Sequence, residues 1–164
     1  MPKNMDQIIY KSIGIIHSPY KTIDNMPIQP AAADGIKGQI ILNEEYVEGL
    51  ADLDGFSHIY LLYHLHLSES YNLKVIPFLD VEHRGLFATR APRRPNSIGL
   101  SVVKLVKIDF NVIEIENIDI VDGTPLLDIK PYIYEMEFVN NPKTGWLSSY
   151  IKEIKSKKSD KRFI

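Results

Sequence analysis

The feature that most constrains the fold is a succession of short strand-like segments without long helices between them. Apolar residues alternate with polar ones, or run together between turn residues, as is typical of strands. Since helices of about 10–15 residues do not alternate with these segments, a parallel α/β sheet is disfavoured. A mainly β protein, a barrel or sandwich with helical decoration, is predicted instead. The predicted strands are residues 8–17, 36–42, 56–67, 73–79, 98–108, 112–118 and 126–133.

Two helices are predicted besides the strands. A short one begins at Asn43 after the second strand, although Gly49 weakens it. The chain of 164 residues has no internal repeat and no long linker, so we predict one domain over residues 1–164, with a core of about 8–137 and a C-terminal helix and basic tail at 144–164. Thr144 is the candidate N-cap of that helix, and its apolar residues recur at helical spacing: Trp146, Leu147, Tyr150, Ile151 and Ile154.

Composition narrows the class of protein. There are no cysteines, which excludes a disulfide framework and a thiolate metal site. No apolar run reaches membrane-spanning length and the N-terminus lacks a basic-then-apolar signal, so we expect a cytoplasmic protein without a membrane partner. The net charge of −2 argues against a general nucleic-acid footprint. Two basic clusters, at 84–107 and 152–162, are local patches suited to a phosphate backbone.

Three arginines and two prolines crowd residues 90–95: Arg90, Pro92, Arg93, Arg94 and Pro95. Proline lacks a backbone donor and pushes the residue before it out of the helical region, so this run is neither a helix nor a central strand. We expect a stiff extended loop, called here the arginine loop (residues 90–97). Forked, permanently charged guanidinium groups suit the binding of a carboxylate or phosphate. A solvated surface loop is the alternative.

Two histidines, His64 and His66, lie two residues apart on a predicted strand, so they share one side of it with His58. They either line a pocket and satisfy core hydrogen bonds, or they hold a metal with help from Asp80, Glu82 or His83. The sequence has no Gly-x-Gly-x-x-Gly after a strand, no Walker-type phosphate loop and no Gly-x-Ser-x-Gly. Rossmann nucleotide binding and serine hydrolysis are therefore disfavoured.

A turn at residues 122–125 offers a carboxylate and backbone amides to an amine or hydroxyl of a ligand. Gln29, between two proline-restrained segments, is either an ordinary surface glutamine, which composition alone favours, or another ligand contact. In the arm that precedes the turn, residues 112–120, apolar side chains alternate with Glu114, Glu116 and Asp119.

Four segments together resemble one family. Arg90-Ala-Pro-Arg-Arg-Pro-Asn-Ser-Ile-Gly-Leu-Ser resembles the signature of the TsaA-like proteins, the TrmO family of tRNA adenine-N6 methyltransferases. Residues 14–20 (Gly-Ile-Ile-His-Ser-Pro-Tyr), 53–62 (Leu-Asp-Gly-Phe-Ser-His-Ile-Tyr-Leu-Leu) and 119–132 (Asp-Ile-Val-Asp-Gly-Thr-Pro-Leu-Leu-Asp-Ile-Lys-Pro-Tyr) resemble it as well. They occur in the expected order over about residues 10–135, which makes the resemblance specific.

The resemblance implies a β-barrel, S-adenosylmethionine as methyl donor and a homodimer with the donor near the subunit interface. No metal is expected, because two histidines without a fixed third ligand are a weak signal. The implied substrate is the threonylcarbamoyl-modified adenosine just 3′ of a tRNA anticodon. The family's Pro-Arg-Gln-Pro is here Pro27-Ile28-Gln29-Pro30, so Ile28 lacks the arginine's charge, and Ser97 stands where many members have proline. Carried over by motif, the donor-binding residues would be Pro27, Ile28, Gln29, His66, Leu67, Arg90, Leu100, Asp122, Gly123, Thr124 and Pro125.

The chemistry that follows from the resemblance is methyl transfer aided mainly by proximity, with a base to take the proton of the nitrogen. Asp122 and His66 are the candidate bases, and Arg90 would fix the donor's carboxylate or order the loop. Arg93, Arg94 and Lys130 are candidate RNA contacts. Two alternatives stay open: a methyltransferase for another RNA or a small molecule, and a metal-dependent barrel hydrolase that uses the two histidines.

Overall fold

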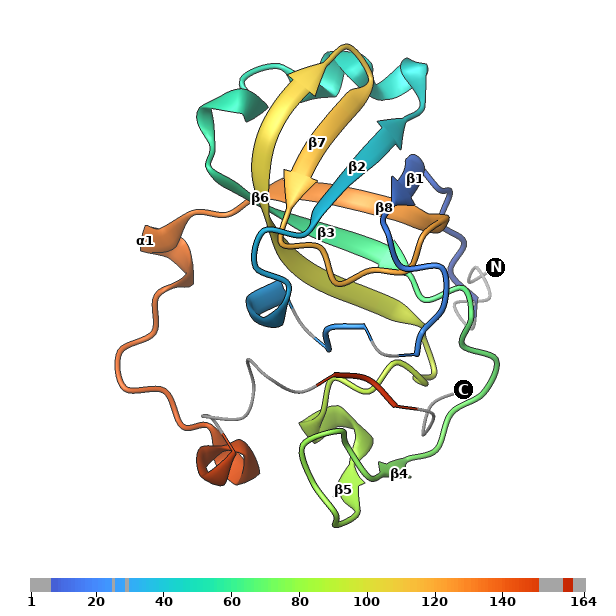
Figure 1. Ribbon diagram of the computed structural model, residues 1–164, viewed down its shortest axis with the longest axis vertical. Helices are drawn as coiled ribbons and strands as arrows, with labels where there is room; N and C mark the ends of the chain where they lie inside the picture. The colour runs from blue at the N-terminus through green and yellow to red at the C-terminus, as the bar shows by residue number, and fades with distance from the viewer. Residues whose placement is uncertain (1–6, 25, 29, 151–157, 161–164) are drawn as a thin grey trace, which may run out of the picture.

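Six antiparallel strands close into a barrel in the computed structural model (Figure 1), which describes residues 7–24, 26–28, 30–150 and 158–160. Their order around the barrel is β1-β2-β7-β6-β3-β8, and the mainly β barrel predicted from the sequence is confirmed. The barrel strands are β1 (Gly14–His17), β2 (Lys37–Leu42), β3 (His58–His64), β6 (Ile98–Asp109), β7 (Val112–Glu116) and β8 (Thr124–Pro131).

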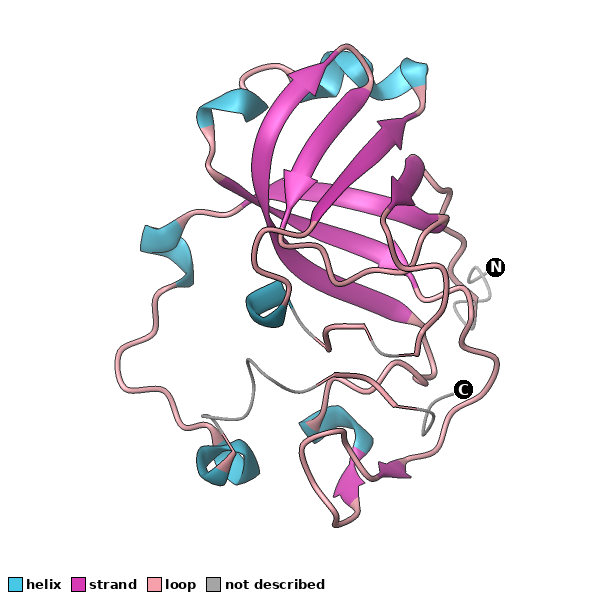
Figure 2. Ribbon diagram, in the orientation of Figure 1, coloured by secondary structure: helices cyan, strands magenta, loops and turns pink. Residues whose placement is uncertain are grey.

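Elements outside the barrel are short and lie at its periphery (Figure 2). β4 (Lys74–Val75) and β5 (Arg84–Gly85) form a separate two-stranded sheet, which lies below the barrel in Figure 1. The one α-helix among the described residues is α1 (Tyr134–Glu137). The remaining helical turns are 3₁₀: η1 (Pro30–Ala32), η2 (Glu44–Leu50), η3 (Leu53–Gly55), η4 (Leu86–Ala88) and η5 (Gly145–Ser149).

The barrel core follows from the two-residue period of its strands. In β3, alternate residues are buried inside the barrel while the residues between them face outward, so this strand is buried on one face only. The fully buried side chains come from the whole circumference and from the segment after β7; they include Ile16, Ile40, Leu61, Val103, Ile113, Ile118 and Leu126. Register shifts in the β3–β8 and β6–β7 pairs bend the sheet, as barrel closure requires.

Several predicted elements differ in length from those observed. The predicted strand 8–17 is a strand only over Gly14–His17, and Ile8, Ile9 and Tyr10 are exposed. Leu73–Leu79 contributes only the two residues of β4, since Pro77 cannot extend a ladder. The hairpin of β6 and β7 is confirmed, with Phe110 at a positive φ of 53° in its turn. The short helix after the second strand is confirmed as the 3₁₀ helix η2.

The predicted C-terminal helix is only partly within the described residues. Its beginning is the 3₁₀ helix η5, and residues 151–157 and 161–164 lie outside the described chain. Within the described residues 158–160, Lys158 forms an isolated antiparallel bridge with Pro27. Ser159 accepts a hydrogen bond from the Met26 amide at 2.9 Å, and its own amide donates to the Met26 carbonyl. The end of the described chain therefore returns to the connection between β1 and η1.

Candidate functional site

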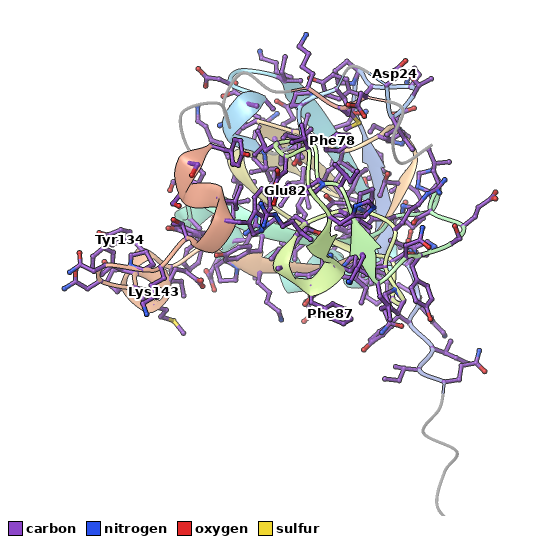
Figure 3. The ribbon with its side chains drawn as sticks, turned by 90° about the horizontal axis from the view of Figure 1, so that it is seen from below. Asp24, Phe78, Glu82, Phe87, Tyr134 and Lys143 are labelled. Atoms are coloured by element: carbon purple, nitrogen blue, oxygen red, sulfur yellow. The ribbon has the colours of Figure 1, made fainter. Side chains whose placement is uncertain are left out.

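A cavity of about 830 Å³, called here the large cavity, lies at one end of the barrel. Its walls come from the beginning of β6, the end of β3, the β7–β8 connection, the arginine loop, residues 26–28 and the C-terminal segment. Phe78 and Phe87, labelled in Figure 3, belong to this lining. Its size and its mostly apolar walls with a few charged groups are typical of a small-molecule site.

Arg90 lines the cavity from the arginine loop, which is neither helix nor strand, as its prolines predict. The side chain forms no ion pair with any residue of the described chain. Its charge still acts across the cavity, where it lowers the pKa of Asp119 against the effect of burial. Arg90 is therefore available to pair with an anionic group of a ligand.

The other two arginines of the loop differ from Arg90. The Arg94 guanidinium donates to the carbonyl oxygens of Thr89 (3.0 Å) and Ala91 (3.3 Å) and lies over the Phe87 ring, so it braces the loop. Arg93 does not line the cavity, and its Nε is buried without a hydrogen-bond partner in the described part of the chain. The three guanidinium groups thus have separate surroundings, which their spacing in the sequence did not indicate.

His66 lies just beyond the end of β3, where the chain turns and the His66 amide donates to the His64 carbonyl. The two-residue alternation ends with the strand, so His66 lines the cavity while His64 does not. The prediction that both histidines share one side is therefore wrong. His66 Nδ1 is 3.4 Å from the hydroxyl oxygen of Thr124, which also lines the cavity and donates to the Val121 carbonyl.

Asp122 lies in a second cavity, of about 530 Å³, with His17, Lys21 and Lys37. Its carboxylate accepts bonds from Lys21 Nζ (2.7 Å) and the Ser18 amide (3.1 Å), and it is 3.1 Å from His17 Nδ1. Pairing with Lys21, the Ser18 amide and His17 lowers the pKa of Asp122 to about 2. Its bonds tie the end of β1 to the turn before β8, where Gly123 adopts a positive φ of 79°.

Asp119 is a cavity residue that the sequence pattern did not single out. Its carboxylate accepts a 2.7 Å hydrogen bond from Ser101, and the Tyr63 hydroxyl lies 3.0 Å from the same serine oxygen. Because the Ser101 proton goes to the carboxylate, Tyr63 is the donor to Ser101. Gly99, opposite Tyr63 in the β3–β6 ladder, leaves room for the tyrosine ring: a Cβ there would overlap it.

The C-terminal segment forms part of the cavity wall through Trp146, Leu147 and Ser159. The Trp146 indole donates a 2.8 Å bond to the Ala88 carbonyl, and its ring stacks on the Arg84 guanidinium. The bond to Ala88 connects η5, which is far along the chain, to η4, next to the arginine loop.

The predicted donor-binding residues fall into three groups. Asp122, Gly123 and Pro125 lie outside the large cavity, and Gln29 lies outside the described residues. Of the candidate RNA contacts, Lys130 is also outside the cavity, on β8, where it pairs with Asp128 at 2.8 Å. The large cavity brings together Pro27, Ile28, His66, Leu67, Arg90, Leu100 and Thr124.

A closed antiparallel barrel with a mostly apolar cavity, lined by an arginine that has no ion pair within the described chain, is typical of a small-molecule-binding protein. The model of the tRNA-methyltransferase O N-terminal domain matches residues 15–138. A probable S-adenosyl-L-methionine-binding protein of Pyrococcus abyssi is 47% identical over 157 residues, which are 96% of this chain and 85% of that protein. The chain therefore belongs to the family of the tRNA-methyltransferase O N-terminal domain.

Two further relatives are larger than this chain. The tRNA (adenine(37)-N6)-methyltransferase of Escherichia coli K12 is 34% identical over 139 residues, covering 79% of this chain and 59% of that enzyme. The crystal structure of TrmO from Pseudomonas aeruginosa superimposes with a TM-score of 0.72 at 34% identity, over 85% of this chain and 62% of that chain. This chain thus spans about three fifths of each of these proteins.

Among the described residues, no group of three or more histidine, cysteine, aspartate or glutamate side chains is arranged to hold a metal ion. Within the same residues, no helix has the length and apolar character needed to cross a membrane.

Proposed function

We propose that this protein transfers a methyl group from S-adenosylmethionine to N6 of the threonylcarbamoyl-modified adenosine 3′ of a tRNA anticodon. The observation that carries the proposal is the large cavity, lined by Arg90 with no ion-pair partner among the residues that the structure describes, in a member of the tRNA-methyltransferase O family. The cavity of about 830 Å³ is large enough for a nucleoside-sized donor. Relatives named as S-adenosyl-L-methionine-binding proteins support this choice of donor.

The residues around the cavity fit the parts of such a donor. Arg90 would bind its carboxylate with a forked pair of hydrogen bonds. Leu67 and Leu100, which are about half exposed at 47% and 48%, line the cavity and would cover the faces of the adenine ring together with Pro27 and Ile28. When bound, the donor supplies a sulfonium-activated methyl group. The role of the chain is then to orient both partners and to exclude water.

Asp122 is proposed as a positioning residue rather than a base. Its carboxylate is occupied by a lysine and a backbone amide outside the large cavity, and it holds the turn from which Thr124 enters the cavity wall. His66 remains a candidate donor or substrate contact, since it lines the cavity beside Thr124.

Contacts to tRNA are proposed for Arg93 and Lys130, which lie outside the donor cavity on the loop and on β8. Arg94 donates hydrogen bonds to backbone carbonyls of the loop, so it would affect RNA binding indirectly, by holding the loop in shape. Binding by a few lysine and arginine side chains releases counterions. We therefore expect the affinity for tRNA to fall steeply between about 50 and 200 mM salt, and a flat response would contradict this part of the proposal.

A homodimer is proposed for the active form. The segment after β8 projects away from the barrel, as the labelled Tyr134 and Lys143 show in Figure 3, and its large apolar side chains are exposed: Tyr134, Met136, Phe138 and Val139. Such a patch favours association with a second subunit. Sedimentation equilibrium should give twice the chain mass of 18.8 kDa.

A cytoplasmic location is proposed as well, because a tRNA substrate would place the enzyme there.

Nucleoside mass spectrometry tests the proposed reaction. The protein is incubated with trideuteromethyl-labelled donor and with two tRNA preparations, one carrying the threonylcarbamoyl group and one lacking it. A mass gain confined to the modified adenosine is expected. Label in a different nucleoside would favour the alternative of another RNA substrate, and label in none would contradict the proposed function. Metal analysis of the active protein tests the hydrolase alternative.

A further inference from the structure

The β7–β8 connection holds a carboxylate at the wall of the donor cavity. Ile118 and Ile120 on either side of Asp119 are almost completely buried, at 0% and 2% exposure, which anchors the backbone between them. The Asp119 side chain reaches the cavity and is bonded to Ser101, which is in turn bonded to Tyr63. The carboxylate is thus held by a hydrogen-bond chain from two barrel strands while remaining open to the cavity.

The surroundings of Asp119 set its affinity for a proton. Burial raises its pKa to about 6, and the Ser101 hydroxyl and the Arg90 charge oppose this rise. The titratable groups that face it are Tyr20, from the segment after β1, Tyr63 on β3 and Arg90 on the arginine loop. Both tyrosines have raised pKa values and stay neutral near pH 7. A carboxylate in this state is mostly ionised at neutral pH, yet basic enough to accept a proton.

Resting on the proposed function, we propose that Asp119 is the catalytic base of the methyl transfer. The bond between N6 and the methyl carbon forms as the bond from that carbon to the donor sulfur breaks. The proton on N6 passes to Asp119, and the products are methylated tRNA and neutral S-adenosylhomocysteine. Before the next cycle, the Asp119 carboxylic acid releases this proton to solvent.

Neither of the two bases suggested by the sequence has the same combination of properties. Asp122 is outside the cavity and its pKa is lowered to about 2 by its bonded neighbours, so it is a weak base. His66 is in the cavity, but its Nδ1 faces the Thr124 hydroxyl. Asp119 alone among the three combines a place in the cavity with a raised pKa.

The first experiment compares Asp119→Asn with the wild type in single-turnover methylation of modified tRNA across pH 5 to 9. The expected loss in rate is about 10²- to 10⁴-fold, the range for removal of a general base. The acidic limb of the wild-type profile, near the pKa of about 6, should disappear. Asp109→Asn is the control, because Asp109 is an exposed carboxylate at the far end of β6.

The affinity of Asp119→Asn for the donor and its product distinguishes two roles of the Asp119 carboxylate, that of a catalytic base and that of an ion-pair partner of the donor's sulfonium. Calorimetry of Asp119→Asn with S-adenosylmethionine and with S-adenosylhomocysteine should give affinities within about threefold of the wild type for both ligands. Tenfold weaker binding of the charged donor, with unchanged binding of the neutral product, would assign Asp119 to the sulfonium and overturn the base. Carboxyl-carbon NMR of the wild type should show the aspartate titrating near pH 6 independently of activity.

Ser101→Ala provides a second variant should Asp119→Asn fail to fold. Loss of the hydrogen bond that favours the charged form raises the pKa of Asp119, so the acidic limb should move up by about half a pH unit. A purely structural role of Ser101 would lower the rate at every pH without moving the limb, and would overturn the inference. If Asp119→Asn methylates tRNA at the wild-type rate, the inference about Asp119 is overturned but the proposed function is not. If the wild type itself does not methylate tRNA, the proposed function and the inference are both overturned.

Discussion

Arg90→Ala should weaken binding of S-adenosylmethionine by about 10- to 100-fold. The guanidinium lines the cavity and has no ion-pair partner in the described chain, so its removal breaks no internal pair. A hydrogen bond to a charged group contributes about 1.5–3 kcal/mol, and each 1.4 kcal/mol is about a factor of ten in affinity. Because Arg90 is exposed, the free energy of unfolding should change by less than about 0.5 kcal/mol.

Isothermal calorimetry near neutral pH measures this effect, and urea unfolding checks the fold. Arg93→Ala is the matched control, since Arg93 is on the same loop but outside the cavity, and should bind the donor like the wild type. An analogue of the donor without its carboxylate should bind wild type and Arg90→Ala equally. The same variant should also raise the pKa of Asp119, because the Arg90 charge lowers it. Unchanged affinity of Arg90→Ala for the intact donor would refute its assigned role.

Three further outcomes are expected. Gly99→Val should destabilise the fold by about 1–3 kcal/mol in urea unfolding, because a side chain there overlaps the Tyr63 ring; stability equal to the wild type would show that the ring moves aside. Asp122→Asn should cost about 1 kcal/mol at pH 7. Since the folded pKa of about 2 is below the unfolded value, that loss should shrink as the pH falls from 4 toward 2, and a constant loss would argue against the ion pairs as its cause. Trp146→Ala removes part of the cavity wall and should weaken donor binding about threefold or more, whereas Trp146→Phe should retain most of the affinity; equal binding by all three proteins would separate the C-terminal segment from the site.

The sequence predicted the barrel and its main hairpin because alternation and turn residues are local signals. The predicted strands were too long where an apolar segment has no neighbouring strand to pair with, as at Ile8 to Tyr10. The arginine loop was predicted from its prolines. The separate surroundings of its three guanidinium groups depend on the folded chain, as in the contact of Arg94 with Phe87 of η4. The spacing of residues along the sequence does not specify such contacts.

Asp119 was missed for a definable reason. The predicted second arm of the hairpin groups Asp119 with Glu114 and Glu116 as the polar members of one alternating segment, although Asp119 is out of step with the two-residue period. β7 ends at Glu116, and Asn117 adopts a positive φ of 66°. The strand alternation therefore does not continue past Asn117 and does not predict which way the Asp119 side chain points. An asparagine between a strand and an Ile-Asp-Ile run was the available signal, since asparagine tolerates the left-handed conformation. His66 was placed on the wrong face for a similar reason, because β3 ends before it.

A crystal structure with S-adenosylhomocysteine tests the central claim most directly. The ligand is expected in the cavity of about 830 Å³, with its carboxylate on Arg90 and its adenine ring between Leu67 and Leu100. Density in the smaller cavity beside Asp122 and Lys37, with the large cavity free of ligand, would contradict the account.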